Sequence, residues 1–250
     1  MRLSDRTILI TGGSSGIGLE LARRLIEKGN TVIVTGRNEE SLEKARLSLP
    51  GLETLRSDVT KPADISALYD TVASRFPKLD TLVNNAGIMR ILKVDEDHDL
   101  DDLTAEIDIG LNGTMRMVQQ FLPLLARQKD GLIVNVSSGL AFVPFPISPV
   151  YSAAKAGVHA YTRCLRVQLK DTSVNVVELA PPLTETRLYQ AEFSKKMNGR
   201  RGMPVDVLVR KAIASIEAGK TEIRPGQSNL LKIASRVAPG LIFREFSKVQ

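Results

Sequence analysis

The sequence predicts an α/β protein with a single doubly wound parallel sheet and helices on both of its faces. Three observations predict this fold. Short apolar runs alternate with stretches of helical periodicity along the 250 residues. A glycine-rich turn follows the first apolar run, and hydroxyl and amide side chains follow later ones. Strict alternation of this kind gives a parallel sheet that binds ligands beyond the carboxyl ends of its strands.

The apolar runs indicate where the strands lie. We expect strands at 7–11, 31–35, 82–83, 132–136 and 174–177. Apolar residues recur at helical spacing from Ile17, and Gly29 marks the end of that helix. The segments 90–103 and 182–204 lack periodicity and are expected to form loops over the site. The length suits one domain covering residues 1–250.

Composition excludes several classes of protein. The single cysteine, Cys164, rules out a disulfide framework and predicts an inert helix residue. We expect no metal site, because His98 and His159 have no other ligands near them in sequence. The net charge of +6 comes from scattered Lys and Arg, which favours a solvated basic surface over binding to nucleic acid.

Hydropathy bears on the location of the protein. The chain contains no apolar stretch of signal-peptide or transmembrane length, so we expect a cytoplasmic protein. The segment 230–244 is apolar and basic. It could contact an anionic membrane surface, cover a substrate pocket or pack in a dimer. We regard membrane contact as the less favoured of these, because a Pro-Gly pair at 239–240 breaks any long helix.

The glycine-rich turn joins the first strand to the first helix. Its residues are Thr11, Gly12, Gly13, Ser14, Ser15, Gly16, Ile17 and Gly18. Glycines let the backbone turn tightly and approach a pyrophosphate, and the helix N-terminus then offers free N–H groups. A glycine-rich turn alone is a weak signal. Here the strand before it and the amphipathic helix after it make a dinucleotide site the favoured interpretation.

The end of the second strand predicts which dinucleotide binds. Folds that bind NAD usually have an acidic residue there, which binds the ribose 2′-hydroxyl. This chain has Gly36 and then Arg37, whose guanidinium can bind a 2′-phosphate. We therefore expect NADP(H) to be preferred over NAD(H). Glu39 and Glu40 follow, but they are expected in the first turn of the next helix.

A tyrosine and a lysine lie one helical turn apart after the strand at 132–136. Tyr151 and Lys155 are spaced to share one face of a helix, and Ser137 and Ser138 follow the preceding strand. A phenol normally titrates near ~10, and a nearby ammonium lowers its pKa. The arrangement therefore predicts acid–base chemistry at Tyr151.

Taken together, these motifs resemble the short-chain dehydrogenase/reductase family over essentially the full chain, with its Rossmann-type fold. The motifs that carry the resemblance are Thr11-Gly12-x-x-x-Gly16-Ile17-Gly18, Asp58-Val59, Asn84-Asn85-Ala86-Gly87, Val134-Asn135-Val136-Ser137-Ser138, Tyr151-x-x-x-Lys155, and Pro181 with Thr186. The segments 137–142 and 179–182 look more particularly like the DltE-type branch.

The resemblance implies roles for individual residues. Tyr151 is the implied general acid or base, Lys155 lowers its pKa and holds the nicotinamide ribose, and Ser138 is the active serine. The implied cofactor-binding residues are Gly12, Ser14, Ser15, Gly16, Ile17, Gly18, Arg37, Asp58, Val59, Asn85, Ala86, Gly87, Tyr151, Lys155, Pro181, Thr184 and Thr186. We expect a homodimer or homotetramer that acts on a small carbonyl or alcohol.

The chain departs from the family pattern at two places. Pro182 stands where a glycine is usual, which removes one N–H donor. Gly110 stands where the family has an asparagine that holds a proton-relaying water. Asn112 is about 200° further round a regular helix, so it is a poor substitute. We expect a water held by backbone at Gly110 instead.

The favoured function is therefore an NADP(H)-dependent oxidoreductase that reduces a carbonyl or oxidises an alcohol. Residues 142–147, just before Tyr151, are expected to form an apolar substrate wall. The alternative is a dinucleotide-binding sensor or scaffold with little turnover, which Gly110 would suit. The presence of Ser138, Tyr151 and Lys155 argues against that alternative.

Overall fold

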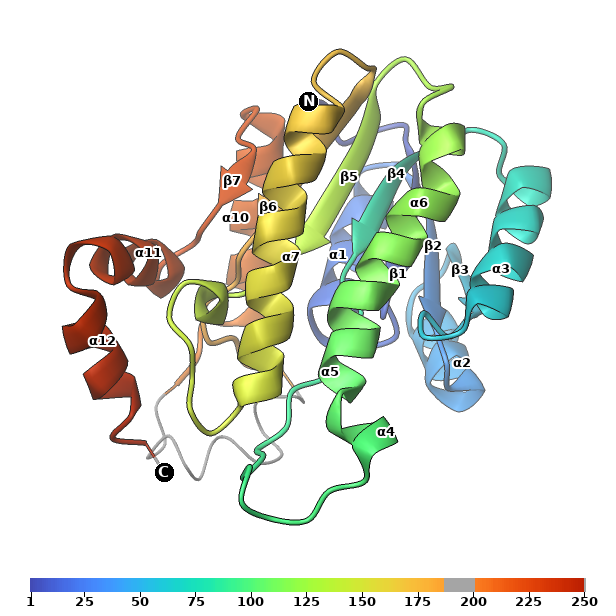
Figure 1. The fold of residues 1–250 in the computed structure, drawn as a ribbon. Helices are drawn as coiled ribbons and strands as arrows, with labels where there is room; N and C mark the ends of the chain where they lie inside the picture. Colours follow the sequence, from blue (N-terminus) through green and yellow to red (C-terminus); the bar gives the residue numbers. More distant parts are fainter. Residues whose placement is uncertain (187–200, 250) are drawn as a thin grey trace.

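A twisted sheet of seven parallel strands runs through the described part of the protein (Figure 1). The structure is a computed structural model and describes residues 1–186 and 201–249. The strand order is β3-β2-β1-β4-β5-β6-β7, and each neighbouring pair is parallel. The order reverses between β1 and β4, which is where folds of this type bind ligands. The expected doubly wound fold is confirmed.

The elements follow one another in β–α alternation. The strands are β1 Thr7–Thr11, β2 Thr31–Gly36, β3 Leu52–Arg56, β4 Leu79–Asn84, β5 Gly131–Val136, β6 Val174–Leu179 and β7 Glu222–Ile223. The helices are α1 Gly16–Glu27, α2 Glu39–Ser48, α3 Pro62–Arg75, α4 Leu100–Leu103, α5 Ala105–Ile107, α6 Gly113–Leu125, α7 Pro149–Gln168, α10 Val205–Glu217, α11 Gln227–Val237 and α12 Pro239–Phe246. A π-helical turn, Asp108–Asn112, leads into α6, and a 3₁₀ turn, Gly139–Ala141, follows β5.

The hydrophobic core lies in two layers, one on each side of the sheet. Helices α1, α2 and α10 cover one face, and α3, α6 and α7 cover the other (Figure 1). Successive residues of a strand point to opposite faces. Accordingly Ile8 and Ile10 of β1 pack in the first layer and Leu9 in the second. All three are fully buried, so the sheet that carries the site is held from both sides.

All five expected strands are present, and the structure adds two strands that were not predicted, β3 and β7. The edge strand β3 has one buried residue, Leu52, and β7 is two residues long, so neither gives a clear hydropathy signal. Gly29 ends α1 as expected, with φ +80°. The segment 90–103 is not loop throughout, because α4 begins at Leu100. Of the segment 182–204, residues 187–200 lie outside the described part.

Helices α11 and α12 follow β7 and lie beyond that edge of the sheet (Figure 1). Leu230, Ile233 and Val237 of α11 and Leu241 of α12 have exposed side chains, whereas Leu231 is half-buried. Among residues 1–186 and 201–249, no helix is long and apolar enough to cross a bilayer.

Candidate active site

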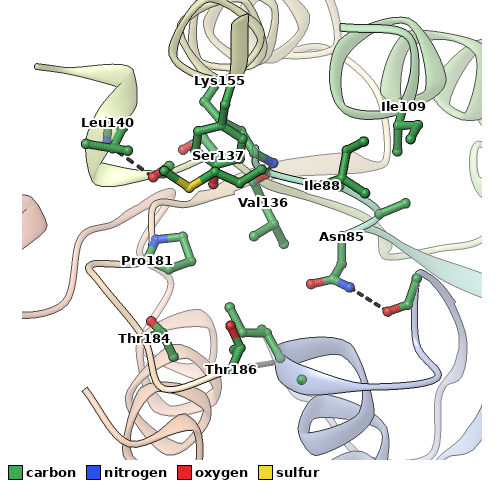
Figure 2. Close-up of a pocket in the computed structure, with 18 of the residues that line it drawn as sticks. Asn85, Ile88, Ile109, Val136, Ser137, Leu140, Lys155, Pro181, Thr184 and Thr186 are labelled. Carbon is green, nitrogen blue, oxygen red and sulfur yellow. Dashed lines mark hydrogen bonds between the residues drawn. The ribbon is translucent and has the colours of Figure 1, made fainter. Parts of the chain in front are cut away.

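The site is a cavity of about 1030 Å³ that begins at the turn after β1 and crosses the carboxyl ends of the central strands. Among the residues predicted from sequence, Gly12, Ser14, Ser15, Gly16, Ile17, Arg37, Asp58, Val59, Asn85, Ala86, Gly87, Ser138, Tyr151, Lys155, Pro181, Thr184 and Thr186 line it. Figure 2 shows Asn85, Lys155, Pro181, Thr184 and Thr186 arranged around this space. The structure therefore brings together motifs that are far apart in sequence.

The turn after β1 requires glycine for two physical reasons. Gly12 and Gly16 have φ values of +63° and +56°, a region that side chains disfavour. A Cβ on Gly12 would lie 2.8 Å from the Ala86 Cα, so the backbones of the two strand ends could not approach this closely. Helix α1 begins at Gly16, and the Ser15 side chain does not cap it. Its first N–H groups are available to an anion.

Gly18 is the exception among the predicted cofactor residues, because it is buried and does not line the cavity. A Cβ there would lie 2.6 Å from both the Asn85 Nδ2 and the Gly12 carbonyl oxygen. Asn85 Nδ2 in turn donates to the carbonyls of Thr11 and Gly12, at 3.0 Å each. Gly18 therefore permits close packing of α1 on the turn.

The end of β2 places one cation at the cavity. Arg37 is exposed, lines the cavity, and forms no ion pair within the described part of the chain. Its neighbour Arg56 is instead within ion-pair distance of Glu39 and Asp64, at 3.7 and 3.5 Å. Glu39 lies in the first turn of α2, as expected. An anion at this end of the cavity would thus meet the guanidinium of Arg37.

Asp58 follows β3 and lies close to Arg37 in the cavity wall. Partial burial acts to raise the pKa of Asp58, but hydrogen bonds from the N–H and hydroxyl of Thr60 lower it overall. The positive charges of Arg37 and Lys61 lower this pKa further. Asp58 is therefore a carboxylate at neutral pH and can accept hydrogen bonds.

Ser138, Tyr151 and Lys155 meet at the other end of the cavity. Tyr151 lies in the first turn of α7 and Lys155 in the next, with the Lys155 Nζ 5.7 Å from the centroid of the Tyr151 ring. Lys155 is buried, and its Nζ donates to the Val136 carbonyl at 2.8 Å. The Ser138 Oγ accepts from the Leu140 N–H at 3.1 Å (Figure 2), which fixes the serine at the start of the 3₁₀ turn.

The pKa values at this centre differ from the expectation. Burial raises the pKa of Tyr151, and only the nearby Ser138 hydroxyl opposes this effect. Burial also lowers the pKa of Lys155 to about 8. The Lys155 ammonium donates to the Val136 carbonyl, and burial is the largest influence on the pKa of the phenol. The Tyr151 phenol therefore keeps its proton at neutral pH.

Gly110, which stands where the family has an asparagine, lies in the π-helical turn, Asp108–Asn112. Gly110 is buried, and its carbonyl accepts from the Thr114 hydroxyl at 2.7 Å. A Cβ on Gly110 would make only an ordinary contact, 3.9 Å from the Ala154 Cβ. The Asn112 Nδ2 donates to Asp108 at 2.8 Å, so this amide is held away from the lysine. The helix is thus distorted at this position, where glycine offers no side chain.

The apolar end of the cavity differs from the predicted substrate wall. Of residues 142–147, only Phe145 lines the cavity. Phe142 instead packs edge-on against His159, and Pro144 and Pro146 are exposed. The rest of the apolar lining comes from Ile88, Met89, Ile109, Val136, Leu140, Leu183, Leu230, Leu231 and Phe246. The rings of Phe145 and Phe246 meet edge-on, with centroids 5.8 Å apart.

The sequence is compatible with three roles for the segment 230–244, and the structure places Leu230 and Leu231 of this segment at the pocket. These two residues and Phe246 come from α11 and α12, and no period or motif in the sequence assigns them to the site. The Phe145 ring meets Phe246 of α12, an element that comes after β7 and is far from Phe145 in sequence. Amphipathicity alone could not distinguish a pocket cover from a surface helix.

The segment before α4 is anchored on this side of the cavity. Arg90 forms ion pairs with Glu106, at 2.6 Å, and with Asp102, at 2.5 Å. Glu106 is 2% exposed, so its charge is compensated by this contact alone within the described residues. The Ser148 hydroxyl donates to the Arg90 carbonyl at 2.6 Å. The segment that carries Met89 is therefore held against the start of α7.

Comparisons with known proteins agree with this geometry. A family model described as short chain dehydrogenase matches residues 6–197. The uncharacterized oxidoreductase DltE of Bacillus subtilis (strain 168) is 38% identical over 250 residues, which is 99% of this chain and 98% of that protein. An uncharacterized oxidoreductase of Staphylococcus aureus (strain MW2) is 34% identical over 201 residues, or 78% of this chain and 87% of that protein.

Two solved structures share the fold. A short chain dehydrogenase from Burkholderia cenocepacia J2315, in complex with NADP, matches with a TM-score of 0.85 and 25% identity, covering 98% of this chain and 99% of that one. A 3-ketoacyl-(acyl-carrier-protein) reductase from Brucella melitensis, complexed with NADH, matches with a TM-score of 0.78 and 27% identity, covering 86% of this chain and 91% of that one.

Proposed function

The chain belongs to the short-chain dehydrogenase family of oxidoreductases, and from this premise we propose that it reduces a carbonyl, or oxidises an alcohol, with NADP(H). One observation carries the proposal. Ser138, Tyr151 and Lys155 line the same cavity as the glycine-rich turn, so one space offers both a dinucleotide cradle and a proton donor.

The residues fit a nicotinamide dinucleotide. Gly12 lets the turn pack against Ala86 where a Cβ would collide, and α1 presents its uncapped N-terminus to the cavity. The volume of about 1030 Å³ is at the upper end of the range for ligand pockets. Asp58 and Asn85 would bind the adenosine half, and Thr186 the nicotinamide half. When bound, the cofactor supplies or accepts the hydride.

The protein's own contribution is to hold a proton where it is needed. Tyr151 keeps its proton at neutral pH, because burial raises its pKa, and can donate it to a carbonyl oxygen. Ser138 can donate a second hydrogen bond to the same oxygen. Burial lowers the pKa of Lys155 to about 8, so near neutral pH this side chain can both release and take up a proton. In the oxidative direction Tyr151 would act as the base.

The end of β2 supports the proposed preference for NADP(H). Arg37 faces the cavity without an ion-pair partner in the described residues, and an anionic phosphate would supply one. An acid that could bind a free ribose hydroxyl is absent from positions 36 and 37. A 2′-phosphate is therefore the better match to this end of the cavity.

The apolar end of the cavity indicates the substrate. Leu140, Phe145 and Phe246 surround the space beyond Ser138 and Tyr151, so the carbonyl would be carried on an apolar or mixed molecule. We also expect the active form to be a homodimer or homotetramer.

The test is NADPH oxidation against a panel of carbonyl compounds of increasing apolar size. The native chain should turn over part of the panel. Tyr151→Phe should bind NADPH with native affinity and lose about 10²-fold or more in kcat, because the proton donor is gone. Tyr161→Phe is the matched control, since it removes a half-buried phenol from the same helix.

The outcomes separate the two candidate functions. Near-native kcat in Tyr151→Phe would show that the proton comes from elsewhere. A native chain that binds NADPH but oxidises it with no member of the panel would favour the sensor.

A further inference from the structure

The buried strand β6 carries a carboxylate. Glu178 is 2% exposed and lies between Val177 and Leu179, which are fully buried. Transfer of a carboxylate from water to such surroundings is costly unless the charge is paired and hydrogen-bonded. A glutamate at this position therefore calls for a physical explanation.

Two side chains from other elements bind Glu178. The Ser137 hydroxyl donates to Oε1 at 2.5 Å. The His159 Nδ1 lies 2.8 Å from Oε2 and 3.0 Å from Oε1, so the imidazole contacts both oxygens. The side chain of His159 is 15% exposed, which keeps most of the pair out of solvent. Glu178 thus joins the end of β5, strand β6 and helix α7 at one point.

These contacts adjoin the catalytic groups, and Ser137 itself lines the cavity beside Ser138. Ser137 immediately precedes Ser138 in the chain. His159 lies one helical turn beyond Lys155 on α7, which places the two on one face of the helix. The Ser137 N–H also donates to the Leu179 carbonyl at 2.8 Å. Glu178 therefore lies between the strand that presents the serine and the helix that presents the lysine.

His159 makes one more contact that bears on Ser138. Its ring meets the Phe142 ring edge-on, with centroids 5.1 Å apart. Phe142 ends the 3₁₀ turn that begins at Ser138. The imidazole is consequently held between the buried carboxylate and the segment that follows the active serine. Rotation or sliding of α7 on the sheet would break the contact with both.

We propose that Glu178, with His159 and Ser137, sets the position of Ser138 relative to Tyr151 and Lys155. Glu178 and His159 are thus positioning residues of the reaction, and this inference rests on the proposed function. A proton donor must be aligned with the carbonyl, and a misplacement of about 1 Å can cost about 10²-fold in rate. A carboxylate that binds both supporting elements would supply that alignment.

The first experiment examines the pair itself and needs no turnover. The chain has two histidines, so His98→Gln leaves His159 as the single imidazole in NMR spectra of isotope-labelled histidine. His98 is exposed, and its replacement leaves the pair intact. We expect Nδ1 of His159 to carry a proton that is protected from exchange. In Glu178→Gln the amide can donate instead, so Nδ1 should be unprotonated.

The second experiment measures kcat and NADPH affinity in matched variants. Glu178→Leu should lower kcat by at least about tenfold with unchanged NADPH affinity, because the catalytic groups are misaligned while the cradle is intact. Glu178→Gln should restore most of the rate, since glutamine can still bind Ser137 and the other His159 tautomer. Ser137→Ala should lower kcat to a smaller extent. Thr162→Val is the control, because it removes a buried α7 hydroxyl that binds Asn135 instead.

The results distinguish this inference from the proposed function. An unprotonated Nδ1 in the native protein, or native kcat in a folded Glu178→Leu variant, would overturn it. Where Glu178→Leu does not fold, a native kcat in both Ser137→Ala and His159→Leu overturns it equally. Absence of turnover in the native chain would contradict the proposed function, and the positioning inference would fall with it even with the expected NMR signal.

Discussion

Replacing Arg37 by alanine should change cofactor selectivity more than cofactor binding as a whole. In the described structure Arg37 faces the cavity and forms no ion pair, so its removal leaves no carboxylate unpaired. Loss of a hydrogen bond to a charged group costs about 1.5–3 kcal/mol, or about 10- to 150-fold in Kd. Arg37 is exposed, so solvent screening places the effect near the lower end, at about tenfold.

The assay is titration calorimetry with NADPH and NADH on the native chain and the variant. NADPH should bind about tenfold more weakly to Arg37→Ala, whereas the Kd for NADH should be nearly unchanged. Raising the salt concentration should reduce the native preference, because the contact is electrostatic. Arg56→Ala is the control: its guanidinium is occupied by Glu39 and Asp64. Equal losses for both cofactors in Arg37→Ala would refute the reasoning.

Three further predictions concern the proton path. Burial lowers the pKa of Lys155 to about 8 and raises that of Tyr151. We therefore expect kcat/KM for reduction to fall as the pH rises through about 8, because Lys155 loses its proton there. A pH profile that stays flat well above this value would contradict this prediction. Gly110→Asn should leave kcat unchanged or higher, since a Cβ there makes only an ordinary contact with the Ala154 methyl. Asn112→Ala should change kcat little, because the amide binds Asp108; a collapse of kcat at native stability and NADPH affinity would make Asn112 the relay.

The fold could be predicted where burial on both faces leaves a continuous apolar run. The strands β1 and β5 are of this kind, and their positions follow directly from hydropathy. The edge strands β3 and β7 could not be found in this way. β3 has one side chain in the core, and β7 is too short for any period to be visible.

The candidate site could also be predicted only in part. Residues whose chemistry depends on local spacing, such as Tyr151 and Lys155, could be identified from sequence, because a helix fixes their relation. Contacts across the sheet could not. Nothing near Glu178 in sequence points to His159, and the one available signal is an acid in a mostly apolar strand. The direction of the Tyr151 pKa shift also depended on burial, which spacing does not reveal.

The position of the single cysteine has a practical consequence. Cys164 is exposed on α7, the helix that carries Tyr151 in its first turn, and lies about 20 Å along the helix axis from that tyrosine. A thiol-reactive dye would therefore label one site of the native sequence, well away from the cofactor. Its fluorescence could follow any tilt of α7 as NADPH and substrate bind. The protein thus carries its own attachment point for time-resolved measurements, with no engineered residue near the reaction.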